Sequence, residues 1–144
     1  MRKSLLWSAT VAISVLAACA TTPRPGQPGY AYNVNGGYEA VFVASNGAFS
    51  GRIDLETSRE GAVTGNFVIV SPISIDGDIV GTIERDSLDW AGTYENTAEG
   101  CGGFISGSGA ITADGQALDG TWSADGCGGN NPPSGTYTFS RETD

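Results

Sequence analysis

Histidine is absent from all 144 residues of this chain. Its absence removes the side chain that most often acts as a general acid or base near neutral pH, and also the commonest metal ligand. The Ser–His and Cys–His catalytic pairs are excluded for the same reason. Because no other catalytic motif is found, we expect a protein that is not an enzyme and that uses no cofactor and no metal.

Lysine is nearly absent as well, with Lys3 the single example, and the formal net charge is −9 at pH 7. A surface this acidic repels nucleic acid and anionic lipid headgroups. We therefore expect no nucleic-acid partner. The charge suits either a basic partner or, as the simpler explanation, solubility in a crowded cell envelope.

The chain has one long apolar run, and it lies at the start. The uncharged segment Leu5–Ala18 follows a short basic start that contains Arg2 and Lys3. It is about 14 residues long, whereas a helix needs ~20 to span a bilayer. This pattern predicts a signal peptide over residues 1–18 and not a transmembrane helix.

The end of this segment, Leu16-Ala17-Ala18-Cys19, resembles the lipobox of bacterial lipoproteins. The resemblance implies a lipid on the Cys19 sulfur, cleavage before Cys19, and acylation of the new amine, for example with palmitate. Two or three acyl chains anchor a protein stably in a membrane. The Ala at position 20, where an Asp would imply inner-membrane retention, points to the outer membrane of a Gram-negative cell, on its periplasmic face or at the cell surface.

Residues 19–37 are rich in Pro, Gly and Thr and have no apolar periodicity. This composition predicts a flexible linker between the lipid and a single folded domain over residues 38–144. From Tyr38 onward, apolar and polar residues alternate in short runs separated by Gly, Asn-Gly and Asp-Gly, which is typical of strands and hairpins. We predict strands over residues 38–44, 48–57, 62–71, 73–84, 88–96, 103–112, 117–124 and 135–141.

Most of these strands carry the pattern apolar-x-Gly-x-apolar, for example Trp90-Gly92-Tyr94 and Leu118-Gly120-Trp122. Alternate residues share a face, so each Gly lies on the apolar face between two large side chains. Glycine there permits a tightly curled sheet. We predict a small antiparallel up-and-down β-barrel of about eight strands, with a flattened β-sandwich as the alternative. The outward positions are mostly polar and charged, which disfavours a membrane-spanning barrel.

With Cys19 lipidated, Cys101 and Cys127 remain. A turn centred on Asp114-Gly115 places these two cysteines within one residue of facing each other. In an oxidising envelope such a pair favours a disulfide over a zinc site or a nucleophile.

Loops on a rigid scaffold are the usual place for recognition. The longest connection predicted here contains Asn130, Asn131, Pro132 and Pro133, which we consider a candidate binding loop. Inside the barrel, Trp90, Tyr94 and Trp122 are expected to belong to the core first and to line a ligand site second.

The repeated strand glycines on a lipidated acidic domain resemble the β-barrels of transferrin-binding-protein-type surface lipoproteins, although the Phe-Tyr-Gly segment of those domains is missing. Gly120-Thr121-Trp122 is similar to a strand start in avidin-like and lipocalin-like barrels. These resemblances imply a barrel and transfer no ligand.

Our leading hypothesis is a membrane-anchored envelope lipoprotein that displays a disulfide-braced barrel to an unknown protein partner or for a structural role. The alternatives are a lipocalin-like carrier of a small ligand, which requires a cavity of ~300 Å³ or more, and an inhibitor of a secreted hydrolase that inserts loop 126–135 into a cleft.

Overall fold

The structure, a computed structural model, describes residues 21–127 and 133–143. These residues form eight β-strands and no helix. The strands are β1 (Gly36–Ala44), β2 (Gly47–Thr57), β3 (Ala62–Ser71), β4 (Ile75–Glu84), β5 (Ser87–Asn96), β6 (Cys101–Ile111), β7 (Ala117–Asp125) and β8 (Ser134–Arg141). The part of the chain described here holds no helix with the length and apolarity that crossing a membrane requires.

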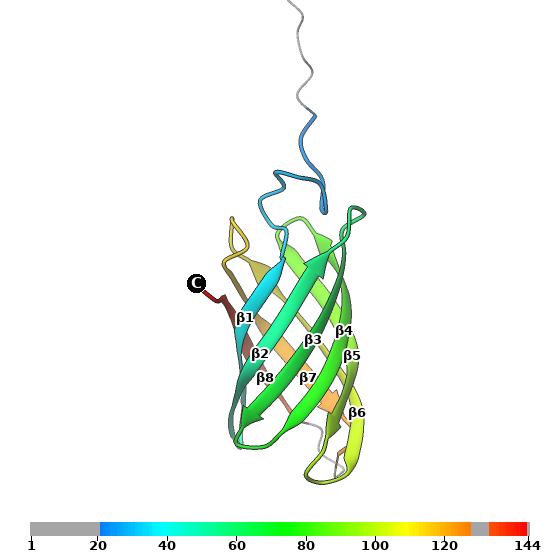
Figure 1. Cartoon of the computed structure of the whole chain (residues 1–144), viewed down its shortest axis with the longest axis vertical. Coiled ribbons are helices and arrows are strands. Elements are labelled where there is room, and N and C mark those ends of the chain that lie inside the picture. Colours follow the sequence, from blue (N-terminus) through cyan, green and yellow to red (C-terminus); the bar gives the residue numbers. More distant parts are fainter. Residues whose placement is uncertain (1–20, 128–132, 144) are drawn as a thin grey trace, which may run out of the picture.

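Each strand pairs antiparallel with its sequence neighbours, and β1 also pairs with β8, so the sheet closes into a barrel (Figure 1). The predicted up-and-down barrel is therefore confirmed, and the sandwich alternative is excluded. Closure satisfies the backbone hydrogen bonds of strands that would otherwise form free edges. The predicted strand limits agree with the observed ones at half of the strand ends and differ by one or two residues at the others.

The pairing of β6 with β7 has the predicted register: Ile111 faces Leu118 and Ile105 faces Ala124 across the turn that contains Asp114-Gly115. Asp114 and Gly115 both have positive φ angles, 120° and 65°. Glycine adopts such angles at no steric cost and Asp tolerates them better than most residues. The turn residues thus determine the register of this hairpin.

The inward face of the barrel is apolar, as the repeat predicted: Trp90, Leu118 and Phe139 are all at most 4% exposed. Strand glycines make room for the large rings of this core. A Cβ atom on Gly107 would lie 2.4 Å from Cζ2 of Trp90, closer than real contacts allow. The indole ring of Trp90 therefore occupies the space that a side chain at position 107 would fill.

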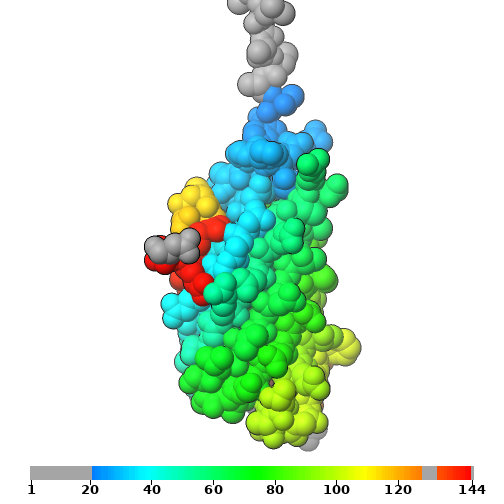
Figure 2. All heavy atoms as spheres, viewed as in Figure 1, coloured from blue at the N-terminus to red at the C-terminus, as the bar shows by residue number. Residues whose placement is uncertain are grey.

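Residues 21–35, here called the N-terminal segment, lie across one end of the barrel (Figures 1 and 2). Val34 is completely buried, and its amide donates to Oγ1 of Thr57 at 3.0 Å. The Tyr30 hydroxyl donates to the Arg85 carbonyl at 2.6 Å, and the Asp114 amide donates to the Ala31 carbonyl at 2.8 Å. The segment is thus held by hydrogen bonds to the end of β2 and to two connections, β4–β5 and β6–β7.

This packing differs from the flexible linker that the sequence predicted over residues 19–37. The Pro and Gly residues are used in tight turns, where the Gly26 amide donates to Oδ1 of Asn33 at 2.8 Å. Those turns bring the apolar Val34 over the core, and burial of its side chain contributes about 1.5–3 kcal/mol. Composition alone did not reveal that this segment has an apolar surface on which to fold.

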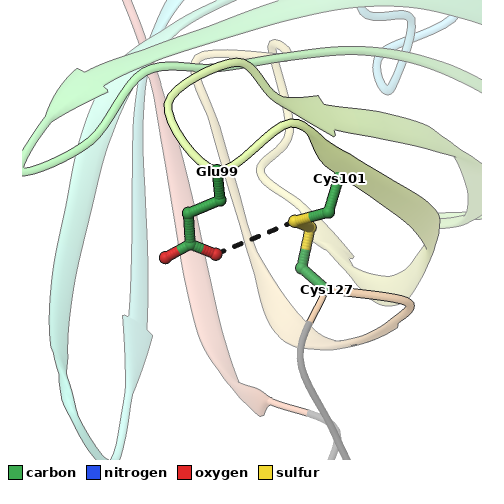
Figure 3. A group of neighbouring side chains, drawn as sticks. All are labelled: Glu99, Cys101 and Cys127. Atoms are coloured by element: carbon green, nitrogen blue, oxygen red, sulfur yellow. Dashed lines mark hydrogen bonds between the residues drawn. A yellow bond between two sulfur atoms is a disulfide. The ribbon is translucent and has the colours of Figure 1, made fainter.

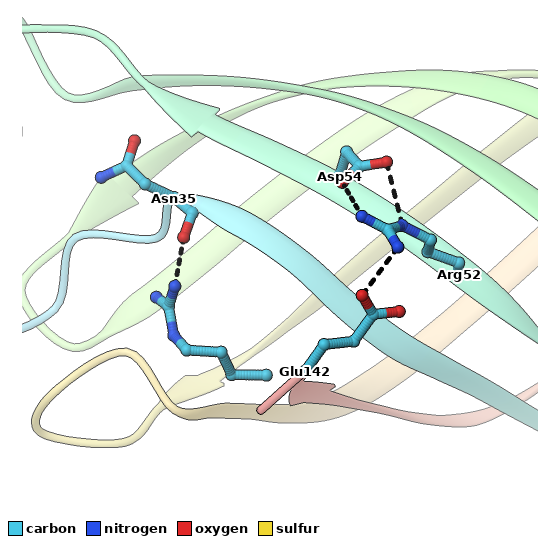
Figure 4. Close-up of polar contacts among 5 residues, drawn as sticks. Asn35, Arg52, Asp54 and Glu142 are labelled. Carbon is cyan, nitrogen blue, oxygen red and sulfur yellow. Dashed lines mark hydrogen bonds and ion pairs between the residues drawn. The ribbon is translucent and has the colours of Figure 1, made fainter. Parts of the chain in front are cut away.

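A buried cluster closes the same end. The Tyr38 hydroxyl donates to the Gly115 carbonyl at 2.8 Å, and Nη2 of Arg141 donates to that hydroxyl at 2.7 Å. The Arg141 guanidinium also lies over the Tyr38 ring, 4.9 Å from its centroid, and donates to the Asn35 carbonyl (Figure 4). Nearby, Arg52 forms ion pairs with Asp54 and with Glu142. We call the end of the barrel that is closed by the N-terminal segment and by Tyr38 and Arg141 the covered end.

Candidate functional site

The opposite end of the barrel, here called the cavity end, is formed by the connections 44–47, 71–75 and 96–101, together with residues 125–127 and 133–134. It contains a cavity of about 260 Å³ that opens between these connections. Most of its walls are apolar or aromatic side chains. The described lining residues are Phe42, Asn46, Phe49, Phe67, Ile73, Ile75, Tyr94, Asn96, Glu99, Ile105, Trp122, Ala124, Cys127 and Pro133.

Five of the lining residues are aromatic and come from five different strands. The Phe42 ring meets the Trp122 ring edge to face with centroids 5.6 Å apart, and it lies 6.1 Å from the Phe67 ring. Such contacts add about 0.5–1.5 kcal/mol per pair beyond area burial. The rings therefore hold one another in place and form a preformed wall around the cavity.

Polar groups enter this wall at Tyr94, Asn96 and Glu99. The Asn96 side chain is 4% exposed, and its Oδ1 accepts hydrogen bonds from the backbone amides of Ala98 and Glu99 at 3.1 and 3.2 Å. The Tyr94 hydroxyl accepts a hydrogen bond from the Cys127 amide at 3.1 Å. Asn96 therefore fixes the turn that carries Glu99, and Tyr94 holds the backbone at Cys127, just beyond the end of β7.

The predicted disulfide joins Cys101 to Cys127, with Cα atoms 5.4 Å apart. A Glu99 carboxylate oxygen lies 3.7 Å from the Cys101 sulfur (Figure 3). A disulfide sulfur has no proton to donate, so this contact is not a hydrogen bond. Glu99, Cys101 and Cys127 come close enough together to suggest a metal site, but a disulfide offers no thiolate, and thiolates are the ligands that zinc needs from cysteine.

The structure brings together only some of the predicted site residues. Tyr94, Trp122 and Pro133 line the cavity, and the two cysteines brace it. Trp90 does not line it: that ring lies deeper in the barrel, 5.6 Å from the Tyr137 ring. Asn130, Asn131 and Pro132 of the candidate loop lie outside the described residues, as does Cys19.

Sequence reasoning missed Asn96 and Phe42 as lining residues. Both had a signal, because Asn96 continues the inward alternation of Trp90 and Tyr94, and Phe42 lies on the inward face of β1. A polar residue at the inward end of a strand marks the limit of the packed core. This signal alone does not distinguish the two ends, because Thr57 and Arg141, in the same register as buried residues, end β2 and β8 at the covered end.

Below the cavity, the barrel centre is filled with rings. Tyr137 is 1% exposed, and among the described residues neither its hydroxyl nor the Trp90 indole nitrogen completes a hydrogen bond. Burial raises the pKa of the Tyr137 hydroxyl, and the nearby Trp90 indole opposes that rise only in part. No polar group in this layer is placed to perform chemistry on a ligand.

A second hollow lies on the outer wall, over β4 to β7, with a volume of about 490 Å³. It is a surface groove between outward-pointing residues. Phe104 and Val80 in its lining are 68% and 63% exposed, which is unusual for large apolar side chains. The groove has a larger volume than the cavity, but few side chains enclose it. A flat surface of a partner protein therefore fits it better than a small molecule does.

No protein-family model and no curated protein matches this chain. A search of solved structures finds similarity to EF1p2_mFAP2b bound to DFHBI, with a TM-score of 0.57 and 14% sequence identity. The match covers 76% of this chain and 94% of that chain. At this level of identity the similarity concerns the β-barrel fold alone.

Proposed function

We propose that the chain is a cell-envelope lipoprotein anchored through Cys19, and that its barrel binds a small, mainly apolar molecule at the cavity end. The observation that carries the binding part is the difference between the two barrel ends. One end is covered by the N-terminal segment, whereas the other holds a cavity of about 260 Å³ lined by aromatic rings. Binding sites for small molecules are typically of this kind, concave and mostly apolar with a few polar groups.

The anchor and the cavity fit together spatially. The described chain enters at the covered end (Figure 1), so a lipid at Cys19 would hold that end toward the membrane. The cavity end would then point away from the bilayer, where a ligand can reach it. The cavity is slightly smaller than the ~300 Å³ usual for ligand sites, so the ligand class is small, about one ring in size.

Ligand binding is tested by filling the cavity. Ala124 lines it and is 8% exposed, so Ala124→Phe places a ring inside. We expect small neutral molecules such as benzene and 3,3-dimethyl-1-butanol to shift the NMR signal of the Trp122 indole in the wild-type full chain and not in this variant. The matched control is Ala91→Phe, at an exposed outward position. If no neutral or charged probe perturbs Trp122, the proposed binding function is wrong.

The anchor is tested separately with Cys19→Ser. We expect the wild-type chain to fractionate with membranes and the variant to move to the soluble fraction. A variant that still fractionates with membranes would contradict lipid attachment at Cys19, whatever the barrel binds.

Protein binding is a second candidate, favoured by the exposed Phe104 and Val80 on the outer wall. Crosslinking in intact cells should capture a partner with the wild type that is lost with Phe104→Ser, while ligand binding in the cavity is retained. Equal capture by both chains would count against this surface. The hydrolase-inhibitor hypothesis rests on loop 126–135, of which residues 128–132 lie outside the described part of the chain.

A further inference from the structure

The cavity end combines aromatic walls with a single carboxylate. Phe42, Phe49, Phe67, Tyr94 and Trp122 contribute rings, and Glu99 contributes the acidic group. The faces of aromatic rings carry partial negative charge and attract cations by about 0.5–2 kcal/mol each, more when the site is desolvated. The aromatic walls and the carboxylate therefore both favour a positively charged ligand.

The Glu99 carboxylate is not used by the protein itself. The two ion pairs among the described residues are both made by Arg52, with Asp54 and with Glu142, and neither involves Glu99. The nearest sulfur, in Cys101, is oxidised and donates no proton to it. The Asn96 side-chain oxygen accepts hydrogen bonds from the amides of Ala98 and Glu99. These bonds hold the turn that carries Glu99 beside the cavity.

Positive charge is missing from this end. None of the described lining residues of the cavity is basic. Of the five arginines of the described residues, Arg52 lies at the middle of β2, where Asp54 and Glu142 pair with it, and the others lie at the covered end: Arg24, Arg59, Arg85 and Arg141. Asp125, Glu95 and Asp76 surround the cavity end on the outer face, at the ends of β7, β5 and β4. An anionic ligand would meet repulsion here, and a cation would meet attraction from several sides.

We infer that the cavity recognises a small organic cation, a ligand whose ammonium group carries alkyl substituents. This inference rests on the proposed binding function and specifies its ligand. Alkyl groups on the nitrogen match the apolar walls, and they lower the cost of removing the charge from water. A bare metal ion fits poorly, because the wall supplies one carboxylate where calcium requires six or more oxygen ligands.

The test compares choline with its neutral carbon isostere, 3,3-dimethyl-1-butanol, by calorimetric titration of the full chain with its disulfide intact. The two probes have nearly the same shape, so shape cannot explain a difference. We expect choline to bind about tenfold more tightly at low salt, with the advantage shrinking as ionic strength rises.

Variants separate the charge effect from folding. Glu99→Gln keeps the size and removes the charge, so we expect choline affinity to fall several-fold while affinity for the neutral isostere is unchanged. The matched control is Glu60→Gln, an exposed glutamate in the turn between β2 and β3 at the covered end, which should change neither affinity. Circular dichroism of both variants checks that the barrel is intact.

Failure of this inference differs from failure of the proposed function. If the isostere binds as tightly as choline, the cavity binds small molecules but not for their charge, and the cation inference is overturned. If Glu99→Gln leaves choline affinity unchanged in a folded barrel, Glu99 has no part in recognition and the inference is likewise wrong. If neither probe binds, nor benzene, the binding function itself is contradicted.

Discussion

The covered end and the cavity end of this barrel are built from the same strands, yet they are closed in different ways. At the covered end, Tyr38 of β1 and Val34 of the N-terminal segment are both completely buried. At the cavity end, Tyr94 and Phe49 are only partly buried and line a hollow. An eight-stranded barrel has just enough interior for its own side chains or for one small ligand. This chain fills one end with its own residues and leaves a cavity of about 260 Å³ at the other.

The two ends also differ in what stabilises them. Hydrogen bonds from the N-terminal segment and from Arg141 hold the covered end together. The cavity end is held by the disulfide between Cys101 and Cys127. A covalent link constrains the chain without occupying the barrel interior. This difference explains how one end can leave a hollow in its interior and still keep its shape.

The largest expected effect is a difference in folding stability between two variants, each of which truncates one tyrosine at one end of the barrel. Tyr38→Ala removes a buried ring, its hydrogen bonds and the contact with Arg141, so we expect a loss of about 3–5 kcal/mol of folding free energy. Tyr94→Ala enlarges a hollow that is already present, so we expect a loss of only about 1–2 kcal/mol. Urea unfolding of the full chain, with the disulfide intact in both variants, measures the difference. Equal losses would show that the two ends are equally packed.

The second prediction removes the covalent brace. In the double variant Cys101→Ser with Cys127→Ser, we expect unfolding free energy to fall by about 3 kcal/mol, given a separation of 26 residues between the cysteines. Amide exchange should accelerate first around residues 96–101 and remain slow around Tyr38. A reducing agent should reproduce the change in the wild type and leave the double variant unaffected. Uniformly faster exchange at both ends would contradict the separate bracing of the two ends.

Much of the fold could be predicted because it depends on local patterns. Alternation gave the strands, the glycine repeat gave the inward face, and Asp114-Gly115 gave the register that brings Cys101 and Cys127 together. Each of these signals lies within a hairpin. Barrel closure followed from the tight curvature that inward glycines permit.

The candidate site could be predicted only in part, because it depends on contacts between distant segments. The N-terminal segment has a loop-like composition, and nothing in its sequence indicates that Val34 would be buried and hydrogen-bonded to Thr57 at the end of β2. Trp90 and Tyr94 carry the same inward signal, yet one lies in the core and the other at the cavity. The two residues differ in their position along the barrel axis, and the alternation of apolar and polar residues predicts only which face of the strand a residue occupies.

The smallest expected effect concerns two buried hydroxyls: that of Tyr38, which is hydrogen-bonded, and that of Tyr137, which has no hydrogen-bond partner among the described residues. Burial raises the pKa of both Tyr38 and Tyr137 above their ordinary value of about 10, although Arg141 partly lowers that of Tyr38. A raised pKa means that the folded state favours the neutral hydroxyl. The stability that this provides is complete below about pH 10 and is lost as pH rises from there toward the folded pKa.

Replacing each hydroxyl separates the covered end from the barrel centre. Tyr38→Phe removes the two hydrogen bonds of this hydroxyl, to the Gly115 carbonyl and from Arg141, while the direct bond from Arg141 to that carbonyl remains, so we expect a loss of about 1 kcal/mol at neutral pH. Tyr137→Phe removes a hydroxyl that has no partner among the described residues, so stability at neutral pH should be unchanged or slightly higher. Each variant should also flatten the alkaline loss of stability. Urea unfolding at pH 7 and at steps above pH 9 measures both effects, and a larger loss from Tyr137→Phe than from Tyr38→Phe would show that the barrel centre, not the covered end, depends on its buried hydroxyl.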